Sequence, residues 1–449
     1  MFENTGTIPL TRVLPPYMPV FYVAFVAALL LTPLMRALAH RHGIVDDPDG
    51  KRKVHTQPIA YLGGVSIFLS WLAGVSVSVF LQPYNTTGVN IQLPPGVLLG
   101  AAIVVLFGLM DDVYGLSPKM KIFGQLTAAL FLIVPGTIGI GQDFFLGIHV
   151  YGEANQHVSG IGWMIFAPLQ RLGILHPEDW TALTGSIVKF AIIGGSGATA
   201  VFTIIAACNA CNLLDGLDGL CSGVTGVMST GYLILALVLA SQGIDPSITA
   251  VDPVRITLSL ALLGAVLGFL PYNFNPASIF MGDTGSMFLG YMCGTMMLLF
   301  GQDGIVRWFL SAVVIFGLPL LDTLLAIVRR KLNGRPIFSP DSNHFHHFLI
   351  RRGFSVKKAV FLSYGLAAVF VSFALVIVVI PTRMALGVYL VLFGWLVVAA
   401  FKIGMIFQQR GPVATNTMIN PLVIHSDGAV TENPPATPAT PPVGSTEAK

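Results

Sequence analysis

Acidic, amide and histidine side chains gather in five short segments of the sequence, each beside a long apolar run. The segments are GIVDDPDGKRKVH (43–55), GLMDDVYGLSPKMKIFGQ (108–125), NACNLLDGLDGL (209–220), PYNFNPASIFMGDTGS (271–286) and SPDSNHFHH (339–347). Carboxylates could bind a divalent cation, and the basic side chains among them could bind phosphate. Ionisable side chains are costly within a bilayer, so their clustering beside apolar runs indicates function.

The second segment contains a pair of carboxylates followed by two lysines. Asp111 and Asp112 end an apolar run and precede Lys119 and Lys121. This order would let the carboxylates meet a metal and the ammonium groups meet phosphate. A solvated helix end explains an acid pair equally well, so the pair alone leaves both interpretations open.

The third segment repeats a polar side chain every three residues, at Asn209, Asn212, Asp215 and Asp218. If the stretch is helical, these side chains lie along one slowly drifting face, which would be costly without a use. The alternative is a loop formed by the turn residues of DGLDG.

The fourth segment places Asp283 among small residues, in MGDTGS. Small residues let backbone N–H groups approach a phosphate, while the carboxylate could take an oxygen-preferring cation such as Mg²⁺. The spacing does not match GxxxxGK[ST], which excludes a P-loop nucleotide site.

The fifth segment carries three histidines, His344, His346 and His347, after the basic stretch 329–335. Imidazole and guanidinium groups together suit a pyrophosphate. A zinc site is the rival interpretation. It is less favoured because no thiolate lies nearby and the carboxylates suit a harder ion.

The composition places the chain in a membrane. Of its 449 residues, 54% are hydrophobic and 10% are charged, and the mean hydropathy is +0.78. Such values lie far above those of water-soluble domains. A net charge of +3 is too small to indicate nucleic-acid binding. The four cysteines lie within or beside apolar segments, so a disulfide framework is not expected.

Eleven apolar runs predict an all-α polytopic membrane protein, a bundle of about 11 transmembrane helices spanning residues 1–410. The runs are Tyr17–Ala39, Leu62–Leu81, Gly96–Met110, Ile122–Ile140, Ile187–Cys208, Val224–Ala240, Ile256–Leu270, Met287–Phe300, Val306–Val328, Ala359–Ile380 and Met384–Phe407. The first has no basic n-region or small-residue cleavage site, so we expect a retained helix. Residues 141–186 are expected to form an external loop excursion, and the Pro/Thr-rich tail 411–449 is expected to be disordered and cytoplasmic.

The distribution of basic residues predicts the orientation of the bundle. Alternate loops share one side, and the loops around 36–57, 111–121 and 329–358, with the C-terminal end, hold most of the 24 Lys and Arg residues. The exceptions are Arg12, Arg171, Lys189, Arg255, Arg307 and Arg383. The positive side should be cytoplasmic, with the N-terminus outside and the C-terminus inside. All five polar segments then fall on the cytoplasmic side, which predicts an active-site face there.

In their order, DDVYGLSPKMK, NACNLLDGLDGL, NPASIFMGDTGS and HFHH resemble the motifs of the polyprenyl-phosphate N-acetylhexosamine-1-phosphate transferases, over about residues 43–353. SPDSNHFHH resembles the branch that transfers N-acetylglucosamine 1-phosphate from UDP-N-acetylglucosamine to undecaprenyl phosphate. That reaction gives undecaprenyl-diphospho-N-acetylglucosamine and UMP, the first membrane step of O-antigen, common-antigen or teichoic-acid type polysaccharide synthesis. The phospho-N-acetylmuramoyl-pentapeptide transferase branch favours adjacent histidines and is the second choice, ahead of a secondary transporter.

The resemblance also implies roles for individual residues. Asp215 and Asp283 would hold Mg²⁺, which Mn²⁺ could replace. The catalytic candidates are Asp111, Asp112, Asp218, His344, His346 and His347. The substrate-binding candidates are Asp46, Lys53, Lys121, Asn209, Asn212, Asn273, Phe280 and Arg330. The expected partners are UDP-N-acetylglucosamine, undecaprenyl phosphate and membrane lipid in the bacterial cytoplasmic (inner) membrane, with no nucleic acid and a homodimer left open.

Overall fold

The structure is a computed structural model, and it describes residues 13–47, 57–81, 93–133, 186–241, 252–301, 306–334, 336 and 344–402. The chain divides into two units, Met1–Phe407 and Gln408–Lys449, and the described residues all belong to the first. Residues 141–185 of the predicted external loop 141–186 lie outside the described residues, as do the tail 411–449 and Lys53, so their predicted roles stay predictions. Ser186 is described and begins a helix.

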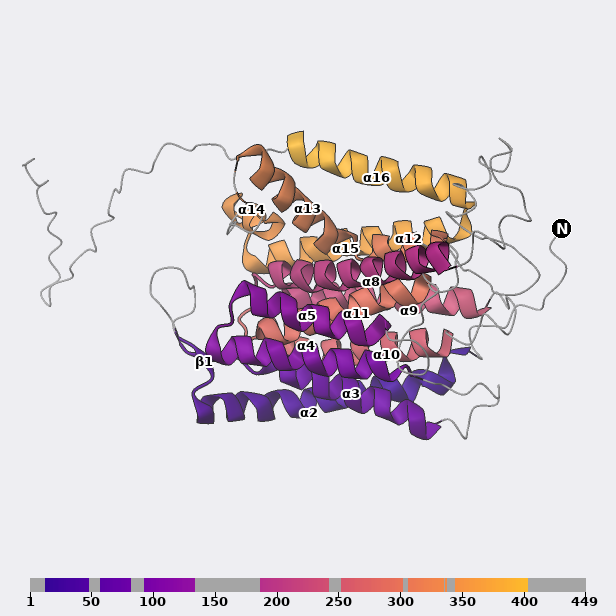
Figure 1. Cartoon of the computed structure of the whole chain (residues 1–449). Helices are drawn as coiled ribbons and strands as arrows, with labels where there is room; N and C mark the ends of the chain where they lie inside the picture. Colours follow the sequence, from indigo (N-terminus) through magenta and orange to yellow (C-terminus); the bar gives the residue numbers. More distant parts are fainter. Residues whose placement is uncertain are drawn as a thin grey trace, which may run out of the picture. The chain divides into compact units, whose positions relative to one another are not determined.

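The described part of the chain is built almost entirely of helices (Figure 1). In chain order the elements are η1 (Pro15–Tyr17), α2 (Met18–His42), β1 (Val45–Asp46), β2 (Ile59–Ala60), α3 (Gly63–Leu81), α4 (Pro95–Tyr114), α5 (Pro118–Ile133), α8 (Ser186–Leu214), α9 (Leu220–Ser241), α10 (Asp252–Asn273), α11 (Gly282–Gly301), α12 (Val306–Ile315), α13 (Gly317–Leu332), α14 (Phe345–Arg351), α15 (Val356–Val379) and α16 (Thr382–Lys402). The prediction of an all-α polytopic membrane protein is confirmed.

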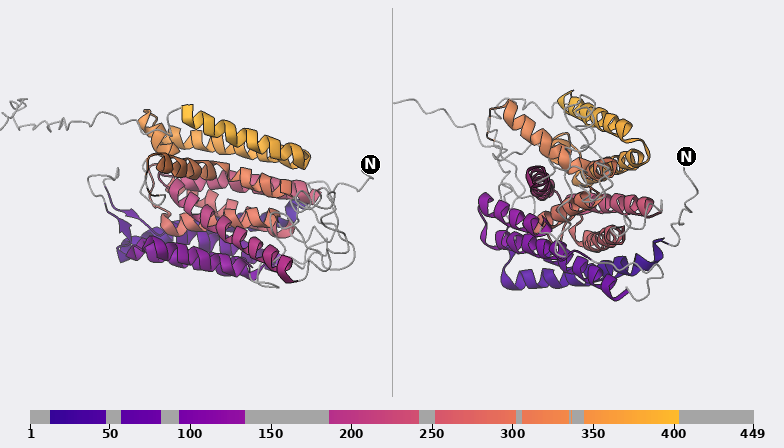
Figure 2. Two further views of the ribbon diagram at one scale, coloured as in Figure 1. Left: turned by 45° about the horizontal axis from the view of Figure 1, so that its top comes forward. Right: turned by 45° about the vertical axis from the view of Figure 1, so that its right-hand side comes forward.

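Helix α11 lies at the centre of the bundle, where it packs against α3, α4, α8, α9 and α12. The views from three directions agree that the other long helices surround it in layers (Figure 2). Its most apolar stretch is 100% buried within the protein. A helix enclosed in this way has no lipid-facing side, so its position is set by protein contacts alone.

Peripheral helices carry apolar rows that face away from the protein. On α2, Tyr22, Val26, Leu30 and Leu34 recur at four-residue spacing, and Leu30 is 68% exposed. Residues four apart lie on one face of a helix. An exposed stripe of large apolar side chains suits contact with lipid hydrocarbon rather than water.

Among the described residues, seven helices are long and apolar enough to cross a membrane, or eight if one bent pair is a single span. The bent pair is α12 and α13, which meet at 76°. The sequence predicts one span over Val306–Val328, and the bend divides it. Pro319 has no N–H to donate to the carbonyl of Ile315, four residues earlier, so the helix breaks there. The predicted count of eleven is not confirmed.

A short strand pair joins two segments that are far apart in the sequence. In the antiparallel pair β1–β2, Val45 opposes Ala60 and Asp46 opposes Ile59. Ala60 also forms a parallel bridge with Ile279, and its carbonyl accepts the N–H of Phe280 at 2.8 Å. These contacts bring the first polar segment against the fourth.

A buried ion pair ties the opposite ends of α10 and α11 together. Arg255 is 1% exposed and donates to Asp252 at 2.7 Å and to the carbonyl of Leu299 at 2.6 and 3.2 Å. Its guanidinium also lies over the ring of Phe300, 5.0 Å from the centroid. The first turn of α10 is thereby fixed to the last turn of α11.

Replacing Arg255 with Met should destabilise the protein by about 3–5 kcal/mol, because Asp252 would lose this partner and the Leu299 carbonyl would lose two donors. Thermal unfolding in detergent would measure the change. The control is Arg383→Met, which alters an exposed arginine at the start of α16. Equal unfolding temperatures for the two variants would contradict a stabilising role for the buried pair.

Candidate active site

Three carboxylates from two helices meet at one end of the bundle. Asp111 and Asp112 lie in the last turn of α4, and Asp283 lies in the first turn of α11. One oxygen from each lies within 4.8 Å of the others. We call these three residues the carboxylate cluster. Oxygen ligands in such a group suit a hard divalent cation.

Asp112 fixes the direction in which α11 begins. Its Oδ1 accepts the backbone N–H of Asp283 at 2.7 Å, and its Oδ2 accepts the N–H of Thr284 at 3.0 Å and the Thr284 hydroxyl at 2.5 Å. The first N–H groups of a helix have no partner within the helix, so an external carboxylate satisfies them. Gly282 has φ 65°, and a Cβ there would lie 2.5 Å from the Asp112 carboxylate. Glycine is therefore needed for this approach.

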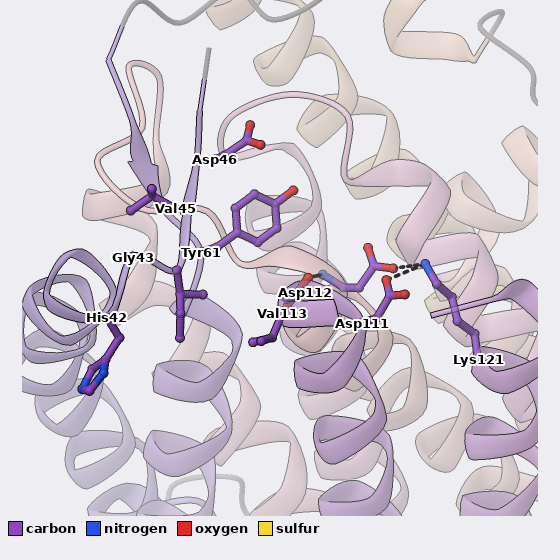
Figure 3. A pocket seen from close by; sticks show the side chains of 11 residues that line it. His42, Gly43, Val45, Asp46, Tyr61, Asp111, Asp112, Val113 and Lys121 are labelled. Atoms are coloured by element: carbon purple, nitrogen blue, oxygen red, sulfur yellow. Dashed lines mark hydrogen bonds and ion pairs between the residues drawn. The ribbon is translucent and has the colours of Figure 1, made fainter. Parts of the chain in front are cut away.

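Lys121, in the first turn of α5, pairs with two members of the carboxylate cluster. Its ammonium lies 2.6 Å from Asp111 and also donates to Asp283 (Figure 3). Asp111 in turn accepts the N–H of Leu116 at 2.6 Å, which fixes the turn between α4 and α5. The predicted Asp and Lys pattern of the second segment thus forms a compact group of opposite charges.

The first half of the third segment is helical and the second half is a loop. The helix interpretation and the loop interpretation therefore each hold for part of it. Asn209 and Asn212 lie on α8, which ends at Leu214, and the two aspartates follow in the loop. Asn212 donates to Asp283 at 2.8 Å and so contacts the carboxylate cluster. Asn209 donates to Gln125 at 2.8 Å and joins α8 to α5.

Asp215 lies in the electrostatic field of the carboxylate cluster. The pKa of Asp215 is raised to about 8, chiefly by burial and then by the charges of Asp283, Asp112 and Asp218 in that order of size. The group of described residues close enough to share a metal consists of the carboxylate cluster and does not include Asp215. Metal binding by Asp215 remains a prediction.

Asp218 and Asn273 hold the loop between α10 and α11. Asp218 accepts the side-chain amide of Asn275 at 2.9 Å and the N–H of Ala277 at 3.0 Å. Asn273 is 2% exposed, accepts the Ser222 hydroxyl at 2.8 Å and donates to the Ile279 carbonyl at 3.1 Å. Both residues therefore fix the loop that leads to Asp283.

A cavity of about 500 Å³ opens between the carboxylate cluster and the β1–β2 strand pair (Figure 3). Asp46, Tyr61 and Lys121 line it together with the three carboxylates. Tyr61 packs edge-on against Phe280, with ring centroids 5.9 Å apart. Burial and the charge of Asp46 raise the pKa of Tyr61, so its hydroxyl stays a neutral hydrogen-bond donor.

The three histidines lie at the start of α14, next to the third segment. The rings of His346 and His347 have centroids 4.2 Å apart, and those of His344 and His346 are stacked at 5.8 Å. His346 is 1% exposed, and burial followed by the charge of His347 lowers its pKa to about 3. It is therefore a neutral imidazole at physiological pH. A Cβ on Gly216 would lie 2.2 Å from its Nε2, so the ring packs directly on the acidic loop.

Several residues of the site escaped the sequence prediction. Tyr61 lines the cavity, Gln125 bonds to Asn209, and Asp322 of α13 bonds to His344. Two of them gave a signal in the sequence: Gln125 ends the second polar segment, and Asp322 is a single acid inside an apolar run. Of the remaining predicted residues, Arg330 lies partly buried in the last turn of α13.

The fold and this group of acids, lysine and histidines define a membrane-embedded enzyme with its site at one end of the helix bundle. Glycosyl transferase family 4 matches residues 94–301. The chain is 31% identical over 393 residues to the probable undecaprenyl-phosphate N-acetylglucosaminyl 1-phosphate transferase of Bacillus subtilis, covering 87% of this chain and 93% of that protein. It therefore belongs to the polyprenyl-phosphate N-acetylhexosamine-1-phosphate transferases of glycosyl transferase family 4, which are phosphotransferases.

Two further relatives show how far the similarity extends. The decaprenyl-phosphate N-acetylglucosaminephosphotransferase of Mycobacterium leprae is 30% identical over 388 residues, covering 81% of this chain and 83% of that protein. The phospho-N-acetylmuramoyl-pentapeptide-transferase of Bacillus mycoides is 29% identical over 343 residues, covering 73% and 87%. The family and the branch expected from the motifs are both confirmed.

Gly216→Ala should lower transferase activity by about 100-fold or more, because the new methyl group would push the buried His346 ring away from the acidic loop. UMP release by the purified variant would measure this. Gly226→Ala is the matched control, since a Cβ there would meet Val266 and Leu267 at ordinary distances of 3.7 and 3.8 Å. Full activity in Gly216→Ala would contradict the close packing described here.

Proposed function

We propose that the protein transfers N-acetylglucosamine 1-phosphate from UDP-N-acetylglucosamine to undecaprenyl phosphate, forming undecaprenyl-diphospho-N-acetylglucosamine and UMP. The observation that carries the proposal is the carboxylate cluster with Lys121 at one end of a membrane-embedded bundle. A soluble nucleotide sugar and the phosphate of a membrane lipid can meet there. The name and the 93% coverage of the Bacillus subtilis relative support this choice of transferred group and acceptor.

A divalent cation fits the donor set of the site. The cluster offers only oxygen ligands within 4.8 Å of one another, as Mg²⁺ requires, and Mn²⁺ accepts the same ligands. Asp283 belongs both to this cluster and to the pair expected from the motifs, so we assign it as a metal ligand. The bound cation would neutralise charge on the pyrophosphate of the nucleotide sugar.

The reaction is a displacement at phosphorus. An oxygen of the lipid phosphate forms a bond to the β-phosphorus of the nucleotide sugar, while the bond from that phosphorus to the bridging oxygen breaks and UMP leaves. Such transfers depend mainly on positioning and charge neutralisation. Asp111 and Lys121 lie on the cavity and would orient the phosphates, whereas Asp112 holds the start of α11.

We place the protein in the bacterial cytoplasmic membrane, with the site on the cytoplasmic side, the N-terminus outside and the C-terminus inside. The excess of Lys and Arg in the loops at the site end supports this orientation. Nucleotide sugars are made in the cytoplasm, so the orientation also gives the donor access to the cavity.

Purified protein supplied with UDP-N-acetylglucosamine, undecaprenyl phosphate and Mg²⁺ should release UMP and form the lipid-linked sugar diphosphate. A parallel reaction with UDP-N-acetylmuramoyl-pentapeptide tests the second candidate function, phospho-N-acetylmuramoyl-pentapeptide transfer. The similarity to the Bacillus mycoides relative supports this candidate. No UMP from either donor would disprove the proposal, and UMP from the pentapeptide donor alone would replace it with the second candidate.

Asp283→Asn should reduce turnover by about 100-fold or more, because the amide carries no charge and binds Mg²⁺ weakly. The variant should also need a higher metal concentration for half-maximal UMP release. Size-exclusion profiles and unfolding temperatures serve as the control for folding. An unchanged metal requirement with near-normal turnover would remove the assignment of Asp283 as a ligand.

A further inference from the structure

Asp322 forms two hydrogen bonds with the segment that begins α14. Its Oδ2 lies 2.8 Å from Nδ1 of His344, and its Oδ1 accepts the backbone N–H of Phe345 at 2.8 Å. Both side chains of the Asp322–His344 pair are enclosed, at 4% exposed for Asp322 and 5% for His344. One carboxylate therefore fixes both the imidazole and the backbone next to it.

The geometry sets the tautomer of His344. An ionised carboxylate can only accept hydrogen bonds, and one oxygen of Asp322 already accepts a backbone N–H. The facing Nδ1 of His344 must then carry a hydrogen. In the neutral ring this leaves Nε2 as the acceptor, the one ring nitrogen that can take a proton or a hydrogen bond from another group.

The burial of the Asp322 carboxylate is costly, so its presence in this helix calls for an explanation. Asp322 lies in an apolar segment, between Leu321 and Thr323, where an ionised side chain is costly. A leucine at this position would fill the same helix without that cost. The two N–H groups that Asp322 accepts compensate for its burial. Both belong to the segment that carries the histidines.

We propose that Asp322 is a positioning residue, which holds His344 with Nδ1 protonated and Nε2 free to accept a proton beside the phosphates of the substrates. The proposal rests on the proposed function, for which the family motifs imply His344 as a catalytic residue. The bend between α12 and α13 gives Asp322 its location, since α13 leaves the direction of α12 by 76° and ends in the basic residues that precede the histidines.

Asp322→Asn separates this role from simple packing, because an amide has almost the same shape but only one accepting atom. Its oxygen can face His344 or Phe345, and its NH₂ then opposes the other N–H. Turnover should fall by about 10- to 100-fold, the range usual for loss of a carboxylate that orients a histidine ligand. Asp322→Glu restores a carboxylate and should retain more activity than Asp322→Asn.

Thr323→Val is the matched control, since among the described residues the Thr323 hydroxyl bonds to the Pro319 carbonyl of its own helix, at 2.9 Å.

Nitrogen NMR of ¹⁵N-histidine-labelled protein reads the tautomer without any need for activity. The His344 signals, assigned by their loss in His344→Gln, should show a protonated Nδ1 in the unaltered protein and in Thr323→Val, and a mixture of tautomers in Asp322→Asn. In the His344→Gln background, Asp322→Asn should cause little further loss of UMP release. If that background is inactive, the NMR result decides.

Two outcomes would overturn the positioning role. One is an unchanged His344 tautomer in Asp322→Asn. The other is an equal loss of turnover from Asp322→Asn with and without His344, which would mean that the carboxylate acts through packing alone. Failure of the unaltered protein to release UMP would instead disprove the proposed function, while the NMR spectra would still report on the bond between Asp322 and His344.

Discussion

The carboxylate of Asp112 at the start of α11 is the interaction on which the rest of the site depends. It accepts the N–H groups of Asp283 and Thr284 across 171 residues or more of sequence, and the missing side chain of Gly282 makes room for it. The same contact joins the end of α4 to the beginning of the central helix. Without it the Asp283 carboxylate would lose its direction, and its bonds to Lys121 and Asn212 would not form together.

The charged groups around this contact are mainly negative and only partly neutralised. Lys121 neutralises part of the carboxylate cluster, while burial and then the negative charges of Asp283, Asp112 and Asp218 raise the pKa of Asp215. The neighbouring His346 is neutral, so it adds no positive charge to offset this. The cluster therefore retains an attraction for cations, which suits a site that must bring two phosphate-bearing substrates together.

Hydropathy and motif order predicted the helical membrane fold and the convergence of the polar segments, because both follow from patterns along the chain. Contacts between distant residues could not be predicted in that way. The spacing of Asn209 and Asn212 gave no sign that one faces Gln125 and the other Asp283. Strands β1 and β2 are too short for a pattern, and the bridge from Ala60 of β2 to Ile279 joins residues far apart in the sequence. Pro319 could have indicated the break before α13, but the apolar run continues through it, so the sequence predicted a single span.

The complete enclosure of α11 also affects how the site responds to its surroundings. Helices at the periphery of a membrane protein adjust their tilt when the bilayer becomes thicker or thinner, because their apolar length must match the hydrocarbon. A helix with no lipid contact receives such changes only through its neighbours. Asp283 stands on that helix and is shielded from such changes, whereas Asp111 and Asp112 stand on α4, whose Leu99 and Leu106 are exposed. A change in bilayer thickness that tilts α4 would therefore reach the carboxylate cluster from one of its two sides.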